Sequence, residues 1–199
     1  MMSPAALISA ALVDVGDARL PRPFRVRAAH LVAYLHPDAA SETTTAEVLA
    51  MAMRCLSMTS IAQTLVFGIW RAYGKDSRVA TWTAKLVERA CAQDHRRTAA
   101  TLCELLGWME GLDGRLSEET GRMLAGFASD PQCQLPLFDF AWRYEHRFGT
   151  TGVPAWVAQI REDPRVLKGA AVVPAGTSRP CPVCRVMPLH YFPRTATPV

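Results

Sequence analysis

Two cysteines near the carboxyl end of the chain have the spacing of a metal-binding turn. Cys181 and Cys184 form a C-x2-C pair, and His190 follows six residues later in the stretch RPCPVCRVMPLH. Two thiolates placed in this way can chelate one tetrahedral zinc ion from a single turn, with His190 as a third ligand. The fourth ligand is open among Cys133, His146 and another chain. The spacing therefore predicts a zinc knuckle, with zinc as the implied cofactor.

The same pair of cysteines allows two other interpretations. It could carry thiol-disulfide chemistry, although that normally requires a helix N-terminus in a βαβ unit, which nothing around Cys181 predicts. It could also be two thiols in a turn without a ligand. Arg185 follows Cys184, where a zinc knuckle usually has glycine to relieve the backbone. Zinc is favoured, and a thiol-dependent redox enzyme remains an alternative.

Basic side chains are concentrated in two acid-free segments. Residues 19–36 contain four arginines, and residues 164–199 contain five basic side chains. Arginines interrupted by proline and phenylalanine can contact phosphates while the ring stacks on a base. The ordinary alternative is a solvated helix face paired with carboxylates of the body. The predicted nucleic-acid-binding residues are Arg19, Arg22, Arg25, Arg27, Arg179, Arg185 and Arg194.

A third polar stretch, DHRRT at residues 94–98, separates two apolar segments. His95 beside Asp94 is not an acid-base pair, because neighbouring helical residues point in different directions. A charged bend is the simpler interpretation. The chain also contains none of the phosphate-loop, dinucleotide, zinc-protease or serine-hydrolase signatures. These absences favour a protein that is not an enzyme.

Helical periodicity extends over about residues 4–162 and must position these groups. In the segment from Pro23 to His36, an apolar stripe of Phe24, Ala28, Leu31 and Leu35 predicts the buried face. Arg25 and His36 are expected to point away from this stripe.

Helix boundaries can be placed from their capping residues. Ser117 and the residues from Ser41 to Thr45 are candidate N-caps, Gly74 is a candidate C-cap, and a break is expected near Ser57. Met1 to Val15 is interpreted as a helix of the mature protein, because a signal sequence would have a basic start. No internal repeat is apparent.

Composition indicates one main core. The chain has 199 residues, half of them hydrophobic, which suffices for a sizeable core. Six cysteines without a secretory signal indicate a reducing, cytoplasmic location, and Cys55, Cys91, Cys103 and Cys133 are expected to pack in the core. The longest uncharged run, Cys55 to Trp70, is 16 residues, shorter than the roughly 20 that a membrane span needs.

Together these features predict a mainly α protein. A multi-helix, bundle-like body would occupy residues 1–163, and a basic, proline-rich tail with the C-x2-C knuckle and a β-hairpin would occupy residues 164–199. The expected function is that of a non-enzymatic nucleic-acid-associated protein, a regulator or small subunit of a nucleoprotein complex. Its partners would be DNA or RNA and other protein subunits, with no membrane. A helical adaptor or chaperone acting through protein contacts is the alternative outside nucleic-acid binding.

Overall fold

The computed structural model describes residues 2–109, 115–149 and 153–171, with side chains through residue 167. These residues form helices and no strand, so the mainly α prediction is confirmed for this part of the chain. The expected C-terminal hairpin lies outside the described residues. The α-helices are α1 (Pro4–Gly16), α2 (Arg22–Leu35), α3 (Glu42–Arg54), α4 (Thr59–Tyr73), α5 (Ser77–Ala92), α6 (Arg96–Trp108), α7 (Glu118–Gly126), α8 (Pro131–Phe148), α9 (Ala155–Glu162) and α10 (Pro164–Ala171), with short 3-10 helices η1 (His36–Asp38) and η2 (Phe127–Ser129).

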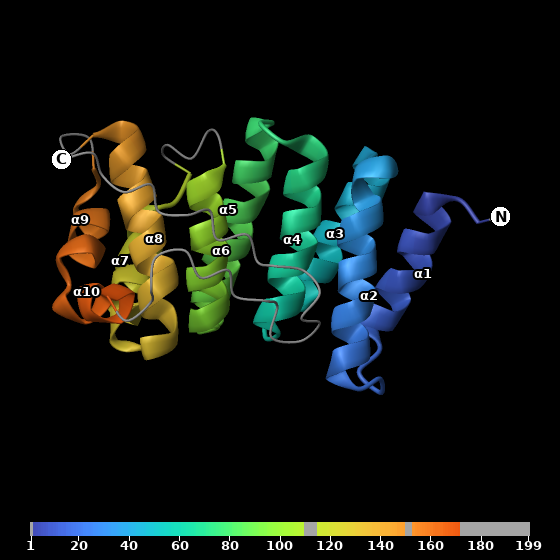
Figure 1. Cartoon of the computed structure of the whole chain (residues 1–199), viewed down its shortest axis with the longest axis horizontal. Helices are drawn as coiled ribbons and strands as arrows, with labels where there is room; N and C mark the ends of the chain where they lie inside the picture. The colour runs from blue at the N-terminus through green and yellow to red at the C-terminus, as the bar shows by residue number, and fades with distance from the viewer. Residues whose placement is uncertain (1, 110–114, 150–152, 172–199) are drawn as a thin grey trace.

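The helices form a row of hairpins arranged in two layers (Figure 1). Along one layer α2 contacts α4, α4 contacts α6, and α6 contacts α8, while α1, α3, α5, α7 and α9 follow one another in the second layer. Successive hairpins begin at residues 4, 42, 77, 118 and 155, which is 35 to 41 residues apart. Stacked helix pairs of this kind are the architecture of an α-solenoid. The structural repeat is therefore present although the sequence shows none.

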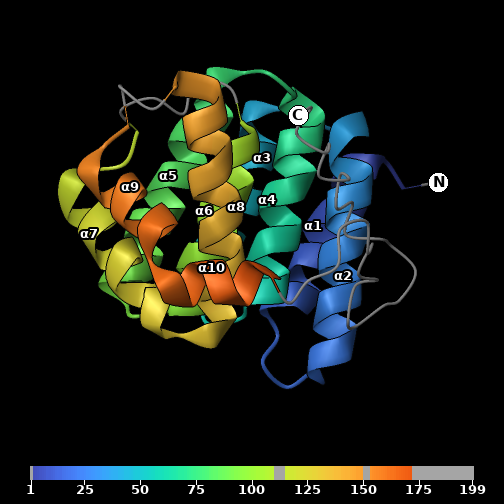
Figure 2. The same ribbon diagram turned by 60° about the vertical axis from the view of Figure 1, so that its left-hand side comes forward.

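The stack continues to Ala171, past the position at which the sequence places the tail. Helix α10 packs against α8 and η2, and in Figure 2 it crosses α8 near the end at which α8 begins. Asp163 starts α10 by accepting a hydrogen bond from the backbone N–H of Arg165 at 2.8 Å. No helix of the described residues is long and apolar enough to cross a membrane.

Short polar side chains begin several of the helices, as the sequence predicts. Ser41 and Ser117 each accept a hydrogen bond from the backbone N–H three residues later, which satisfies one of the free donors at a helix start. Gly74 ends α4 with a φ of 57°, a conformation that glycine adopts without strain. The expected break near Ser57 is the loop between α3 and α4.

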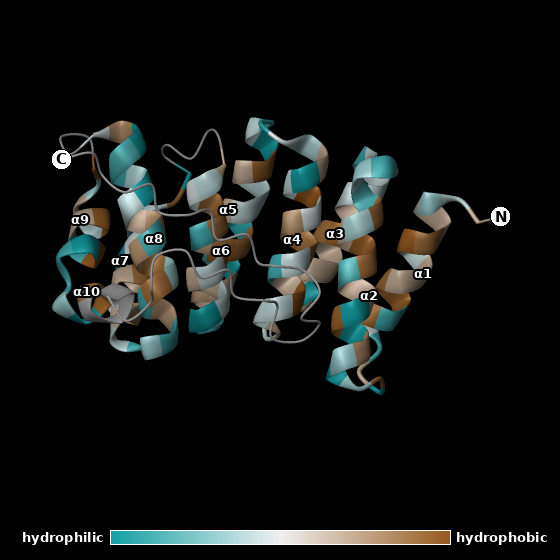
Figure 3. Ribbon diagram, in the orientation of Figure 1, coloured by the Kyte–Doolittle hydropathy of each residue, from teal (hydrophilic) through white to brown (hydrophobic). Residues whose placement is uncertain are grey.

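A cluster of buried apolar residues draws on helices of both layers, and hydrophobic residues recur along these helices in Figure 3. The cluster includes all four described cysteines, as predicted, and burial raises the pKa of their thiols. Two glycines permit close helix contacts: a Cβ on Gly68 would lie 2.6 Å from the Ala33 Cα, and one on Gly121 would lie 2.4 Å from the Trp156 ring. Small residues at these points set the spacing of the hairpins.

Helix α2 is rotated relative to its prediction. Its buried residues are Val26, Ala29, Val32 and Ala33, whereas Phe24 and Leu31 of the predicted stripe are 57% and 44% exposed. His36, expected to point away, is fully buried. The predicted face was half right: Ala28 and Leu35 are partly buried against the core, but Phe24 and Leu31 are not. Helix α2 meets α4 where Gly68 approaches Ala33, and a Cβ on Gly68 would already be too close to Ala33 at that point.

Candidate functional site

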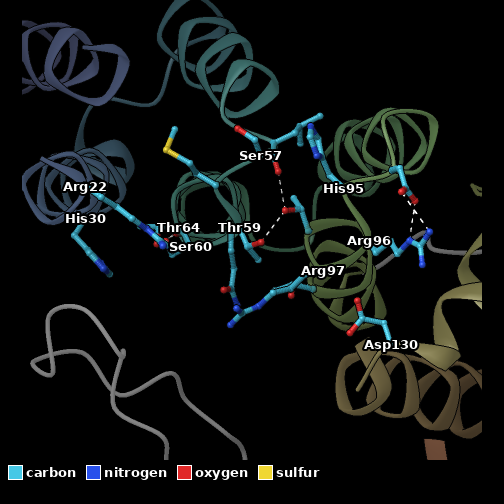
Figure 4. A pocket seen from close by; sticks show the side chains of 16 residues that line it. Arg22, His30, Ser57, Thr59, Ser60, Thr64, His95, Arg96, Arg97 and Asp130 are labelled. Atoms are coloured by element: carbon cyan, nitrogen blue, oxygen red, sulfur yellow. Dashed lines mark hydrogen bonds and ion pairs between the residues drawn. The ribbon is translucent and has the colours of Figure 1, made fainter. Parts of the chain in front are cut away.

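A polar groove of about 730 Å³ lies where α4 and α6 begin, beside α2 and the start of α8 (Figure 4). Arg22 and His30 of α2 form one side, and Arg96 and Arg97 of α6 form the other. Hydroxyl and amide side chains of α4 lie between them: Thr59, Ser60, Gln63 and Thr64. Residues from four hairpins thus line one surface.

The groove lies at the N-terminal ends of two helices without side-chain caps. Met58 precedes α4 and His95 precedes α6, and neither makes a side-chain capping hydrogen bond. The first backbone N–H groups of a helix lack partners within the helix, and the helix dipole places partial positive charge there. These two ends therefore favour an anion in the groove, in the manner of phosphate-binding helix starts.

A short series of hydrogen bonds holds the starts of α4 and α6 against each other. The hydroxyls of Thr59 and Thr98 are 2.8 Å apart, and the Thr98 hydroxyl donates to the Leu56 carbonyl at 2.7 Å. Thr98 is buried, so these bonds are shielded from water. These hydrogen bonds connect the start of α6 to the start of α4 and to the loop before it, and so hold the residues between the groove arginines in one geometry.

Two of the groove arginines have only neutral oxygen partners in the part of the chain that the structure describes. Arg22 donates to the Ser60 hydroxyl at 3.5 Å, and Arg97 donates to the Gln132 amide oxygen at 3.3 Å. Figure 4 places them on opposite sides of the start of α4. Long hydrogen bonds to neutral groups leave both guanidinium charges available to an anion.

The third arginine is held by a carboxylate. Arg96 donates to Asp94 at 2.8 Å and lies over the Phe127 ring at 5.6 Å. The hydrogen bond from Arg96 lowers the pKa of Asp94, so this pair stays charged at neutral pH. Asp130, the remaining acid of the groove, caps α8 by accepting from the Gln132 N–H.

Asp94 also shapes the bend that brings DHRRT into the groove. Its φ is +55°, in the left-handed region, and the His95 N–H donates to the Ala90 carbonyl at 2.9 Å. This is the Schellman arrangement that ends a helix, with aspartate where glycine is usual. The bend predicted from the sequence is confirmed. Its place beside α2 and α4 could not be predicted, because Arg22 and Arg97 are 75 residues apart.

The predicted N-terminal arginines do not share one surface. Arg22 lines the groove, Arg25 is half-buried and donates to the Val15 carbonyl at 2.8 Å, and Arg27 lies over the Phe24 ring. Arg19 pairs with Asp17 at 2.9 Å and lowers the pKa of that carboxyl to about 2. Of the four, Arg22 is the one that the structure places in the groove. Arg179, Arg185 and Arg194 lie outside the described residues.

The predicted zinc ligands Cys181, Cys184 and His190 also lie outside the described residues. Among the described residues, no group of three metal-ligating side chains comes together. Cys133 is fully buried, and burial raises the pKa of its thiol to about 12, which disfavours the thiolate that zinc needs. His146 is exposed and stacks on Trp142, with ring centroids 4.6 Å apart. Of these two candidates for the fourth ligand, His146 has the more accessible side chain.

Fold and site together define an α-helical repeat protein with a polar, arginine-containing groove at the starts of α4 and α6. Comparison with known protein families, with curated protein sequences and with solved structures finds no match.

Proposed function

We propose that this protein is a non-enzymatic nucleic-acid-associated protein, a regulator or small subunit of a nucleoprotein complex, whose groove binds the phosphate backbone. The observation that carries the proposal is the convergence of Arg22, Arg97 and two helix N-termini without side-chain caps on one groove. Phosphate contacts supply essentially all of the affinity in non-specific nucleic-acid binding and a large share of it in specific binding. An α-solenoid supports this role because stacked hairpins present an extended surface to a long ligand.

The proposal predicts binding that weakens with salt. Replacing Arg22 and Arg97 together with alanine is expected to weaken the binding of a fluorescent oligonucleotide. The slope of log affinity against log salt should fall by about one unit for every phosphate that the variant no longer binds. The matched control replaces Arg19 and Arg78, which are exposed and already paired with Asp17 and Asp76.

The control variant decides how a loss of affinity is interpreted. An equal loss in both double variants would show a general charge effect and contradict the groove. DNA and RNA versions of the same oligonucleotide would define the preferred nucleic acid.

The tail is proposed to add a zinc site built from Cys181, Cys184 and His190. Pro180 and Pro182 flank Cys181 in the sequence and would stiffen a turn there, and the chelating spacing is that of structural zinc. Protein purified without a histidine tag should contain close to one zinc ion per chain and lose it at acidic pH, as protons compete for sulfur. A value near zero would exclude the knuckle, and reversible disulfide formation between the two cysteines would then support the redox alternative.

A helical adaptor is the second candidate, and one observation favours it. Large apolar side chains of α2 are exposed to solvent, namely Phe24, Leu31 and Tyr34. Exposed apolar patches mark sites of interaction, and solenoids commonly bind proteins on such surfaces. An adaptor would bind a partner with little dependence on salt and independently of Arg97. The dependence of binding on salt and on Arg97 therefore separates a helical adaptor from a nucleic-acid-binding protein.

A further inference from the structure

We propose that the outward face of α2 stacks the bases of a single-stranded nucleic acid whose backbone lies in the groove. The inference rests on the proposed function and deepens it by naming the class of ligand. The face consists of Phe24, Arg27, Leu31 and Tyr34, which recur at intervals of three and four residues and so line one side of the helix. These four residues form the α2 face.

The side chains of the α2 face are available to a ligand. Phe24 is 57% exposed and Tyr34 is 61% exposed. Large aromatic rings are normally buried, and a contiguous exposed group of them marks a binding surface. Leu31 lies between the two rings along the helix and extends the apolar surface. Tyr34 is ten positions after Phe24, which corresponds to about 15 Å along a helix axis, long enough to contact more than one nucleotide.

Charge favours an anionic ligand on this face. Arg27 belongs to the face itself, Arg22 and His30 of the same helix line the adjoining groove, and the segment from Arg22 to His36 contains no acid. The Arg27 guanidinium lies 5.9 Å from the centroid of the Phe24 ring. An arginine next to an aromatic ring provides both a phosphate contact and a stacking surface, which is the combination that holds single strands.

The α2 face is continuous with the groove. Arg22 and His30 of the same helix line the groove, and His30 lies one helical turn from both Arg27 and Tyr34. A backbone that contacts Arg22 and Arg97 therefore passes alongside the helix that carries the exposed rings. Phosphates in the groove and bases on α2 can be held by one strand.

A single strand fits this face better than a duplex. Aromatic side chains stack on the faces of bases, and in a duplex those faces are covered by neighbouring base pairs. An acidic amphipathic helix of another protein is the competing occupant. It would need the apolar character of Phe24 rather than its aromatic ring, and this difference makes the two distinguishable.

The test measures fluorescence anisotropy of the full chain with three probes that have equal numbers of phosphates: oligothymidylate, the same backbone without bases, and a duplex. Wild type should bind oligothymidylate about tenfold more tightly than the abasic strand, and Phe24→Ala or Tyr34→Ala should each remove up to about tenfold for oligothymidylate alone. Phe24→Trp should retain the affinity for oligothymidylate, whereas Phe24→Leu should lower it as Phe24→Ala does. Val13→Ala is the matched control, since Val13 is 71% exposed on the neighbouring helix α1.

The outcomes separate the inference from the function on which it rests. If the arginine double variant loses binding while both aromatic variants keep it, the stacking face is overturned and the groove stands. Equal affinity for all three probes overturns the stacking face in the same way. If wild type binds no nucleic acid, both proposals fail. Binding of a synthetic acidic amphipathic helix that survives Phe24→Leu, without binding of oligothymidylate, would assign the face to a protein partner.

Discussion

Helices α2 and α8 contain similar residue types and use them differently. Both are rich in arginine and aromatic residues. In α8 these side chains make internal contacts: Phe140 stacks on Trp156 with centroids 5.7 Å apart, and the Arg143 guanidinium lies 3.1 Å from the Trp108 ring centroid. In α2, Phe24 and Tyr34 face solvent.

Position in the stack explains this difference. Helix α8 contacts α6, α9 and α10, so helices cover it on several sides, whereas α2 lies in the first hairpin and packs mainly on α1 and α4. Contacts that lock α8 in the fold are therefore unavailable to the outer side of α2. The same chemistry stabilises the fold in one helix and remains available for binding in the other.

The largest expected effect compares one residue type in the two helices. Phe140→Ala removes a fully buried ring and should lower the free energy of unfolding by about 3–5 kcal/mol, through lost transfer energy and the cavity left behind. Phe24→Ala should change it by no more than about 0.5 kcal/mol, as is usual for exposed sites. Urea denaturation of both variants measures the difference. Similar losses would contradict the assignment of Phe24 to an exposed face.

The next effect concerns the contact that orients α2. Gly68→Ala would place a Cβ 2.6 Å from the Ala33 Cα, and relieving that overlap should cost about 1–3 kcal/mol. Gly126 provides the control: it is helical, and a Cβ there has no atom within 4 Å. Gly126→Ala should raise stability by about 0.4–1 kcal/mol by restricting the unfolded chain. A neutral Gly68→Ala would show that α2 and α4 are not tightly packed.

Two regions of the stack should respond to pH in opposite directions. Near α8, burial and then the Asp139 carboxylate raise the pKa of Glu104 to about 8, against the opposing charge of Arg143. The fold thus favours protonated Glu104, and the stability that this group contributes is fully present below the ordinary pKa of glutamate and is lost as pH rises through about 8. Near α2, burial lowers the pKa of His36, so its contribution is present above about 6.5 and is lost as pH falls below that value.

Urea denaturation across about pH 5 to 9 tests both groups. Glu104→Gln should flatten the alkaline limb of the stability curve. His36→Gln should lower stability at every pH by disturbing the hydrogen bond with Thr45, and it should also flatten the acidic limb. Each variant serves as the control for the other. An alkaline limb that survives Glu104→Gln would assign the loss to another group.

The smallest expected effect is on binding. Asp94→Asn removes the charge that pairs with Arg96 while keeping a residue that tolerates the left-handed backbone. It should tighten nucleic-acid binding a few-fold and raise the salt slope by up to about one unit, as Arg96 becomes free to contact phosphate. Asp76→Asn, which leaves Arg78 with Glu42 as its carboxylate partner and lies away from the groove, is the control. Equal gains in both variants would indicate net charge rather than the groove.

Local features of the sequence were sufficient to predict much of the helical body. Ser41, Ser117 and Gly74 define helix ends through their own side-chain or backbone properties, which act within a few residues. The bend at Asp94 and the burial of the four cysteines follow from the same short-range patterns. Of the candidate site, Arg22 was predicted from the sequence as a nucleic-acid-binding residue, while the groove that it shares with Arg97 was not predicted.

Long-range packing decided how the helices are arranged. Size and hydrophobicity favour Phe24 and Leu31 as the buried side of α2, yet the close approach of Gly68 to Ala33 admits only small side chains and turns the larger ones outward. A repeat of 35 to 41 residues arises without sequence similarity, because stacking requires a buried apolar stripe on each helix rather than particular residues.

Short-range patterns thus specify which segments are helices and where many of them end, because capping and periodicity act between residues close in the chain. The exposed face of α2 and the meeting of Arg22, Thr59 and Arg97 in one groove depend instead on the stacking of hairpins. Residues so far apart in the chain come together only through the packing of whole helices, which no local pattern encodes.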